Sequence, residues 1–192
     1  MTATPIPRTL AMSAYGDLDH SVIDELPPGR KPINSVLLNN VRRANVIERV
    51  HQACANGQQA YWICPLIETS EVLQCEAAED TALLLGQQLQ GVNVGLVHGR
   101  LAAADKAQVM AQFKVGEIQL LVATTVIEVG VDVPNANLMV IDNAERLGLA
   151  QLHQLRGRVG RGQAQSHCLF MYQAPISRMG RERLDILRQS ND

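Results

Sequence analysis

Short apolar blocks alternate with longer mixed blocks along most of the chain. Runs dominated by Val, Ile and Leu are typical of buried strands, and they occupy residues 33–38, 60–67, 92–97, 120–123, 138–141 and 166–172. Segments of helical length and composition predict helices over residues 40–55, 71–89, 103–113 and 176–189. Asn39 and Asn40 can cap the first of these helices, and the pair Asn56-Gly57 can end it.

This alternation of strands and helices predicts the fold class. Continuous apolar strands separated by helices favour a mainly parallel sheet with helices on both faces, because right-handed crossovers place successive helices over the sheet. We therefore expect a doubly wound α/β domain. Functional residues in such domains gather in the loops that follow the carboxyl ends of the strands.

Residues 151–162 combine an apolar stripe with arginines and glycines. If the segment is helical, one narrow face holds Leu152, Leu155 and Val159, and a separate polar face holds Gln154, Arg158 and Arg161. Glycines at three of the last six positions are costly in a helix, which indicates a backbone that must come close to something. A solvated basic helix ending at Gly162 is an equally good interpretation of the spacing alone.

Composition adds few constraints. The chain has 192 residues, of which 46% are hydrophobic and 19% charged, as in ordinary globular domains, and no apolar run is long enough to span a membrane. A cytoplasmic location is the default expectation. The cysteines, Cys54, Cys64, Cys75 and Cys168, lack paired Cys-x-x-Cys spacing, so we expect buried reduced thiols and no metal site.

Charge is distributed unevenly along the chain. Residues 51–141 carry three basic and nine acidic side chains, whereas residues 142–192 carry eight basic and five acidic ones. Contacts with a polyanion should therefore favour the last quarter of the chain and the loops. Several arginines are most simply interpreted as solvated charge, although some could still lie along duplex DNA, and these are Arg146, Arg156, Arg178, Arg181, Arg183 and Arg188. His153 is interpreted as a hydrogen-bonded surface histidine.

The pattern of residues 154–161, Gln-x-x-Gly-Arg-x-Gly-Arg, resembles the sixth sequence motif of superfamily 2 helicases. That resemblance implies a RecA-like (P-loop NTPase-type) C-terminal helicase domain. It also implies that Arg158 and Arg161 reach the γ-phosphate of an ATP held by the preceding domain, as arginine fingers do. By the same analogy, Gln154 would orient water or phosphate.

Residues 123–134 follow the fourth predicted strand. Their residues suit a β-turn with capping threonines, but the stretch also resembles the fifth helicase motif. The resemblance assigns Thr124 and Thr125 to DNA contacts, and Gly130 and Asp132 to the ATP side. Glu128 would couple the two.

The triplet His98-Gly99-Arg100 follows the third predicted strand. A simple turn explains it adequately, although the glycine permits close approach of a phosphate and Arg100 adds charge. The equivalent loop in superfamily 2 helicases touches the DNA backbone, so the resemblance assigns all three residues to DNA binding.

The first residues, 1–10, look like a flexible arm by composition. Thr2 and Thr4 and the residues after them nevertheless resemble the third motif of one branch of these helicases, which closes the first motor domain and couples the two motor domains. We therefore expect a piece of a longer protein. Residues 1–31 would end the first motor domain and form a linker, residues 32–174 the second motor domain, and residues 175–192 the start of a helical hairpin.

The sequence contains no Gly-x-x-x-x-Gly-Lys-Ser/Thr phosphate loop and no strand-borne Asp-Glu pair for Mg²⁺. The pair Asp24-Glu25 does not qualify, because Leu-Pro-Pro follows it. ATP and Mg²⁺ would thus be held mainly by the first motor domain of the full-length protein, and this chain alone should be inactive.

These features support one hypothesis over two alternatives. The chain would be the second motor domain of an ATP-dependent DNA helicase that remodels stalled replication forks and branched junctions. One alternative is the motor domain of a transcription-repair coupling factor. The other is a non-catalytic α/β module that binds nucleic acid.

Overall fold

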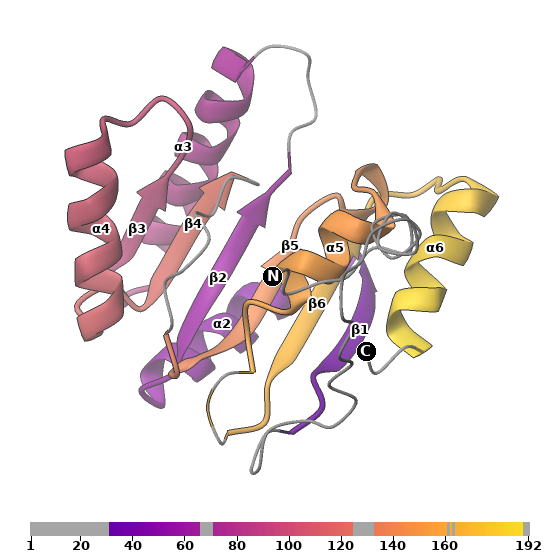
Figure 1. The fold of residues 1–192 in the computed structure, drawn as a ribbon, viewed down its shortest axis with the longest axis horizontal. Helices are drawn as coiled ribbons and strands as arrows, with labels where there is room; N and C mark the ends of the chain where they lie inside the picture. The colour runs from indigo at the N-terminus through magenta and orange to yellow at the C-terminus, as the bar shows by residue number, and fades with distance from the viewer. Residues whose placement is uncertain (1–30, 66–70, 125–132, 161, 163, 190–192) are drawn as a thin grey trace, which may run out of the picture.

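The computed structural model describes residues 31–65, 71–124, 133–160, 162 and 164–189. Within these residues the chain forms one six-stranded sheet with the strand order β1-β6-β5-β2-β4-β3, and every pair of neighbouring strands is parallel (Figure 1). The strands are β1 (Asn34–Asn39), β2 (Gln59–Cys64), β3 (Val94–Val97), β4 (Leu120–Thr124), β5 (Ala136–Ile141) and β6 (His167–Tyr172). The prediction of a parallel α/β sheet is confirmed.

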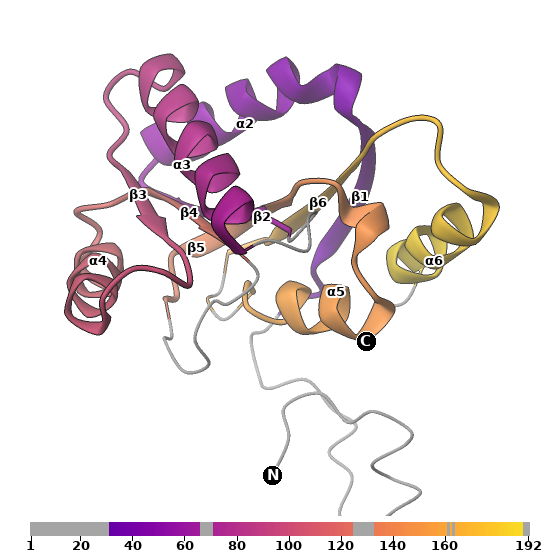
Figure 2. The same ribbon diagram turned by 90° about the horizontal axis from the view of Figure 1, so that it is seen from above.

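Helices cover both faces of this sheet (Figure 2). Their bounds are η1 (Asn40–Arg42), α2 (Arg43–Ala55), α3 (Glu71–Gln88), α4 (Ala103–Val115), η2 (Ala144–Arg146), α5 (Leu149–Arg156) and α6 (Arg178–Gln189). Helices α2 and α3 lie over one face, and α4, α5 and α6 over the other. Asn39 caps η1 as its spacing predicts, because its side chain accepts a hydrogen bond from the Val41 amide at 3.0 Å.

The central strand β2 shows how the two faces are filled. Successive side chains of a strand point to opposite faces, so Tyr61 and Ile63 pack into the core under α4, α5 and α6. Trp62 and Ala60 pack into the core under α2 and α3. Each of these four side chains is at most 2% exposed, which explains why β2 contains almost only apolar residues.

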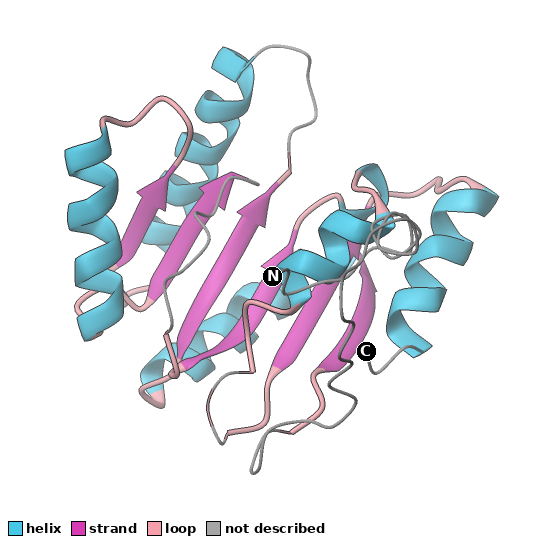
Figure 3. Cartoon of the chain, viewed as in Figure 1, coloured by secondary structure: helices cyan, strands magenta, loops and turns pink. Residues whose placement is uncertain are grey.

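One predicted helix differs from the structure. The helix proposed for residues 151–162 is α5, which begins at Leu149 and ends at Arg156 (Figure 3). Gly160 adopts a φ of 80°, a left-handed conformation that a right-handed helix does not accommodate, so the described residues 158–160 do not continue the helix. Leu152, Leu155 and Val159 are nevertheless buried as predicted, although Val159 reaches the core from beyond the end of the helix.

Helix α6 packs on the same core as the sheet, because Leu184 and Leu187 are fully buried in it. The division into a motor domain and a separate hairpin starting at residue 175 stays a prediction. None of the described helices is long and apolar enough to cross a membrane.

Candidate nucleotide and nucleic-acid interface

All carboxyl ends of the strands lie at one edge of the sheet, at the top of Figure 1. Two of the predicted DNA-contacting segments meet there. Val97 of β3 pairs with Ala123 of β4, so the next residues along the two strands, His98 and Thr124, lie in neighbouring positions. The segments predicted to touch DNA are therefore adjacent in space although their positions differ by 26 residues in sequence.

The loop after β3 points its residues in different directions. His98 is only 6% exposed, and its Nε2 lies 3.2 Å from a carboxylate oxygen of Glu79 on α3. The carbonyl of Gly99 accepts a hydrogen bond from Lys106 Nζ at 2.8 Å. Arg100 is exposed. Of the predicted triplet, Arg100 is thus the side chain that faces solvent. His98 is buried and connects the loop to α3 through its contact with Glu79.

Thr124 ends β4 and is 3% exposed. In this conformation the residue is covered, and its assignment to DNA stays a prediction. Several other predicted site residues lie outside the described part of the chain, and these are Thr2, Thr4, Thr125, Glu128, Gly130, Asp132 and Arg161.

The segment after α5 carries Arg158, one of the two arginines that the helicase resemblance assigns to ATP. Arg158 is half-buried, and its backbone amide donates to the carbonyl of Leu155 at 2.9 Å. Its guanidinium has neither a hydrogen-bond acceptor nor a carboxylate partner among the described residues. Gln154 on the last turn of α5 is exposed. Both side chains are therefore available to a ligand or to another domain.

Arg156, two residues earlier, does not fit its prediction. It is 4% exposed, its Nη1 donates to the carbonyl of Leu187 on α6 at 3.1 Å, and its Nη2 lies 3.4 Å from Nε2 of His153. The interpretation of Arg156 as solvated charge is wrong, because it follows Leu152 by four residues and so shares the buried face of α5. Arg183 is not simply solvated either, because its Nη1 donates a hydrogen bond of 2.6 Å to the carbonyl of Leu147.

Two glycines allow the chain after Arg158 to lie close to other parts of the domain. A Cβ at Gly162 would collide with the backbone carbonyl oxygen of Pro134, and one at Gly160 would lie 3.0 Å from Cγ1 of Ile33. The expectation that these glycines allow close backbone approach is confirmed at Gly162. The neighbour it approaches is the turn just before β5.

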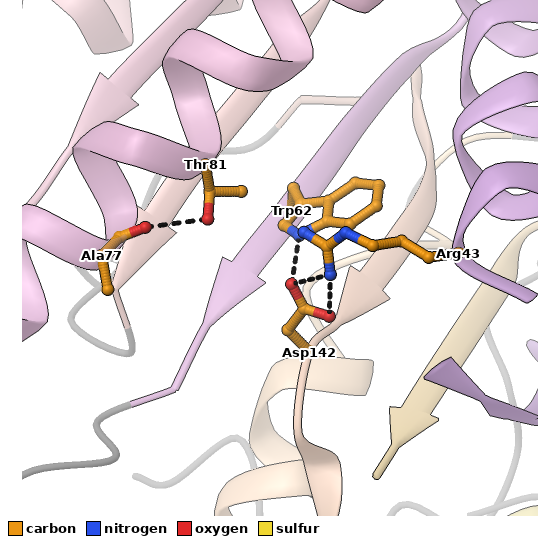
Figure 4. A network of polar contacts seen from close by, with 5 residues as sticks. All are labelled: Arg43, Trp62, Ala77, Thr81 and Asp142. Carbon is orange, nitrogen blue, oxygen red and sulfur yellow. Dashed lines mark hydrogen bonds and ion pairs between the residues drawn. The ribbon is translucent and has the colours of Figure 1, made fainter. Parts of the chain in front are cut away.

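The sequence did not reveal a partly buried ion pair at the same edge (Figure 4). Nη1 of Arg43 lies 2.8 Å from both carboxylate oxygens of Asp142, and Nε1 of Trp62 donates to one of them at 2.9 Å. The Arg43 guanidinium carbon stands 4.9 Å from the centroid of the Trp62 ring. The signal that could have found it is Asp142 itself, a lone acid directly after an apolar strand.

The cysteines are free thiols. Burial raises the pKa of Cys54 to about 11 and that of Cys168 to about 12. Burial, reinforced by the charge of Asp142, raises the pKa of Cys64 to about 12. The prediction of reduced thiols without reactive chemistry is consistent with these environments. Within the described ranges, no group of His, Cys, Asp and Glu side chains could hold a metal ion.

Comparisons with known proteins identify the class. Residues 43–163 match the family described as the helicase conserved C-terminal domain, and the chain belongs to this family. Along its whole length it is 64% identical to the ATP-dependent DNA helicase RecG of Escherichia coli strain K12, and 50% identical to RecG of Bacillus subtilis strain 168. The chain spans 28% of the length of each of these relatives.

Solved structures agree with this assignment. A structure of RecG bound to a three-way DNA junction matches 99% of the chain with a TM-score of 0.82 and 45% sequence identity, and the chain covers 25% of it. Saccharomyces cerevisiae Dbp5 bound to RNA and ADP BeF3 matches 98% of the chain with a TM-score of 0.66 at 16% identity, over 47% of that protein. This second likeness shows the fold alone, which is RecA-like.

Proposed function

We propose that this chain is the second motor domain of a RecG-type, cytoplasmic ATP-dependent DNA helicase that remodels stalled forks and branched junctions. The observation that carries the proposal is Arg158, a half-buried residue whose guanidinium has no partner among the described residues and whose sequence context resembles the arginine-finger motif. A partly buried charge without a partner is costly. An anionic ligand that pairs with Arg158 would remove that cost, so the site favours such a ligand.

The chemistry expected of this chain is neutralisation of charge. ATP and Mg²⁺ would be held mainly by the first motor domain, and Mg²⁺ would neutralise phosphate oxygens there. Arg158 and Arg161 would donate to the γ-phosphate and stabilise the charge that develops during its transfer, with Gln154 beside them. On this proposal Gly130 and Asp132 face the nucleotide, Glu128 couples the two sites, and the chain alone does not hydrolyse ATP.

DNA would lie along the carboxyl ends of β3 and β4. Arg100 is exposed there. The backbone of the preceding residue, Gly99, is held in place by the hydrogen bond from Lys106 to its carbonyl. Thr124 and Thr125 would add hydroxyl and amide donors to a phosphate. Contacts of this kind carry little sequence information, which suits a protein that recognises branched DNA by shape.

The nucleotide half of the proposal is tested by Arg158→Ala in the full-length protein. We expect DNA-stimulated ATP hydrolysis to fall by about 10³ to 10⁵, the range typical of arginine fingers, while DNA affinity is retained. Steady-state hydrolysis and fluorescence anisotropy with a three-way junction measure the two quantities. Arg178→Ala is the matched control, because Arg178 is an exposed arginine paired with Glu182. Normal hydrolysis by the Arg158 variant would remove the residue from the site.

The DNA half is tested by Arg100→Ala. Loss of one phosphate contact should weaken binding of all junctions similarly and reduce the salt dependence of log K by about one ion. Lys114→Ala serves as the control, since Lys114 is exposed at the opposite end of the helix that follows the loop. An unchanged salt slope in the Arg100 variant would place the DNA elsewhere.

A further inference from the structure

The ion pair of Arg43 and Asp142 lies where the chain connections diverge. Neighbouring strands β2 and β5 end side by side, but the chain leaves β2 towards α3 on one face and leaves β5 towards η2 and α5 on the other. Such a divergence opens a crevice at the carboxyl edge of an α/β sheet. Here the Asp142 side chain, 9% exposed, occupies that position under the guanidinium of Arg43.

Both the backbone and the side chain of Asp142 are fixed. Its amide donates to the carbonyl of Ile63 at 2.9 Å, which extends the ladder between β2 and β5 by one residue. Its carboxylate accepts hydrogen bonds from Arg43 and from Trp62. Charge-assisted hydrogen bonds are among the strongest that side chains make, so the point at which the chain leaves β5 is held by bonds from α2 and β2.

A continuous series of short-range bonds leads from Asp142 to the arginine segment. Asn143 takes a φ of 43°, a turn that few residues other than glycine adopt, and η2 follows at once. The amide of Gly148 donates to Oε1 of Gln151 at 3.1 Å, and the amide of Leu152 to the carbonyl of Gly148 at 3.0 Å, which starts α5. No long loop lies between Asp142 and Gln154, because η2 and α5 follow Asp142 closely. A change in the direction of the chain at Asp142 would therefore also move α5.

We propose that Asp142, clamped by Arg43 and Trp62, is a positioning residue that sets the direction of α5 and thereby the location of Arg158, which follows that helix. Arg43 begins α2, directly after the first strand and its short η1, so the clamp also ties the entry of the chain into the domain to the segment that carries the arginines. This inference rests on the proposed function. A simple structural ion pair would contribute to folding and leave the chemistry of the folded protein unchanged.

The test is a double-mutant cycle between Asp142→Asn and Arg158→Ala in the full-length protein. Single-turnover and steady-state ATP hydrolysis on a three-way junction give the rate and KM, anisotropy gives DNA affinity, and thermal unfolding reports folding. We expect Asp142→Asn to lower kcat by about 10- to 100-fold, as misplaced catalytic groups do, while leaving DNA affinity within about twofold. In the Arg158→Ala background the same substitution should change the rate by less than about twofold, because the group it positions is already absent.

Each outcome decides something. If Asp142→Asn costs the same factor in both backgrounds, or leaves kcat unchanged, the positioning role is overturned although Arg158 keeps its own role. If Arg158→Ala hydrolyses ATP normally, the proposed function itself fails. Should Asp142→Asn not fold, Trp62→Phe removes a single donor to the carboxylate and keeps most of the apolar ring. That variant should show a smaller loss of kcat, again absent in the Arg158→Ala background, and an unchanged kcat would contradict the proposal.

Discussion

The exposed arginines of α6 and the arginines at and just after the end of α5 differ in their partners. On α6, Arg178 lies 2.8 Å from Glu182, and Arg181 lies 3.2 Å from Asp185, so each exposed guanidinium has a carboxylate one helical turn away. Between Glu145 and Glu182 the sequence contains no acidic residue at all. Arg156 and Arg158 therefore have no acidic residue within one helical turn along the chain, and Arg158 has no partner among the described residues.

The difference shows that local charge pattern separates two kinds of arginine better than helical spacing does. Where acids alternate with arginines, the pairs neutralise each other and contribute little to stability in solvent. Where acids are missing, an arginine is either buried against carbonyl groups, as Arg156 is, or left available for an anion, as we propose for Arg158. Substitutions along the two segments should therefore have very different effects.

The largest effect on stability is expected for Arg156→Ala. The substitution removes a buried side chain that donates to Leu187 and leaves a void between α5 and α6, so the free energy of unfolding should fall by about 2–4 kcal/mol. Urea denaturation of the chain measures this change. A loss no larger than that of an exposed arginine would contradict the role of Arg156 as an internal partner of α6.

The next effect concerns the loop between these arginines and the sheet. Gly162→Ala should lower the free energy of unfolding by about 1–3 kcal/mol, because the new methyl group would meet the carbonyl oxygen of Pro134, which belongs to the backbone and not to a flexible side chain. Gly86→Ala is the matched control and should change stability in the opposite direction, by about 0.5–1 kcal/mol. Gly86 is exposed within α3, with no atom in the way of a Cβ. Equal signs for the two glycines would refute this interpretation.

The smallest effect is expected for Arg178→Ala. Its side chain is 93% exposed, and its pair with Glu182 is open to solvent and salt. The midpoint of urea unfolding should stay within measurement error of the unsubstituted chain, and added salt should abolish any residual difference. A clear loss would mean that α6 depends on its charge pairs, and the contrast between the two segments would weaken.

Much of the fold could be predicted because the core strands can be recognised from their apolar sequences. The runs of β2, β4 and β5 are buried on both faces, so nearly every residue is apolar and the strands are visible without knowing their neighbours. The end of α5 was predicted too late, since the apolar stripe continues to Val159 whereas the backbone turns at Gly160. Hydrophobic period alone does not detect a loop that happens to keep the spacing of a helix.

The candidate site was predictable only in part. Arg158 and Arg100 could be assigned through a resemblance, but the burial of Arg156 depends on a helix, α6, that follows it by more than twenty residues. The pair of Arg43 and Asp142 joins positions 99 residues apart, and no local pattern reports such a contact. Trp62, which completes it, was visible only as the single tryptophan of the chain.

Helix α6 also affects how this chain behaves towards other copies of itself. It lies beside β1, the strand at one border of the sheet, while the strand at the opposite border, β3, has only four residues (Figure 1). An uncovered, long border strand offers unpaired amide and carbonyl groups on which foreign strands can add and aggregation can begin. Because a helix lies beside one border strand and the other border strand is short, we expect little strand addition at either border.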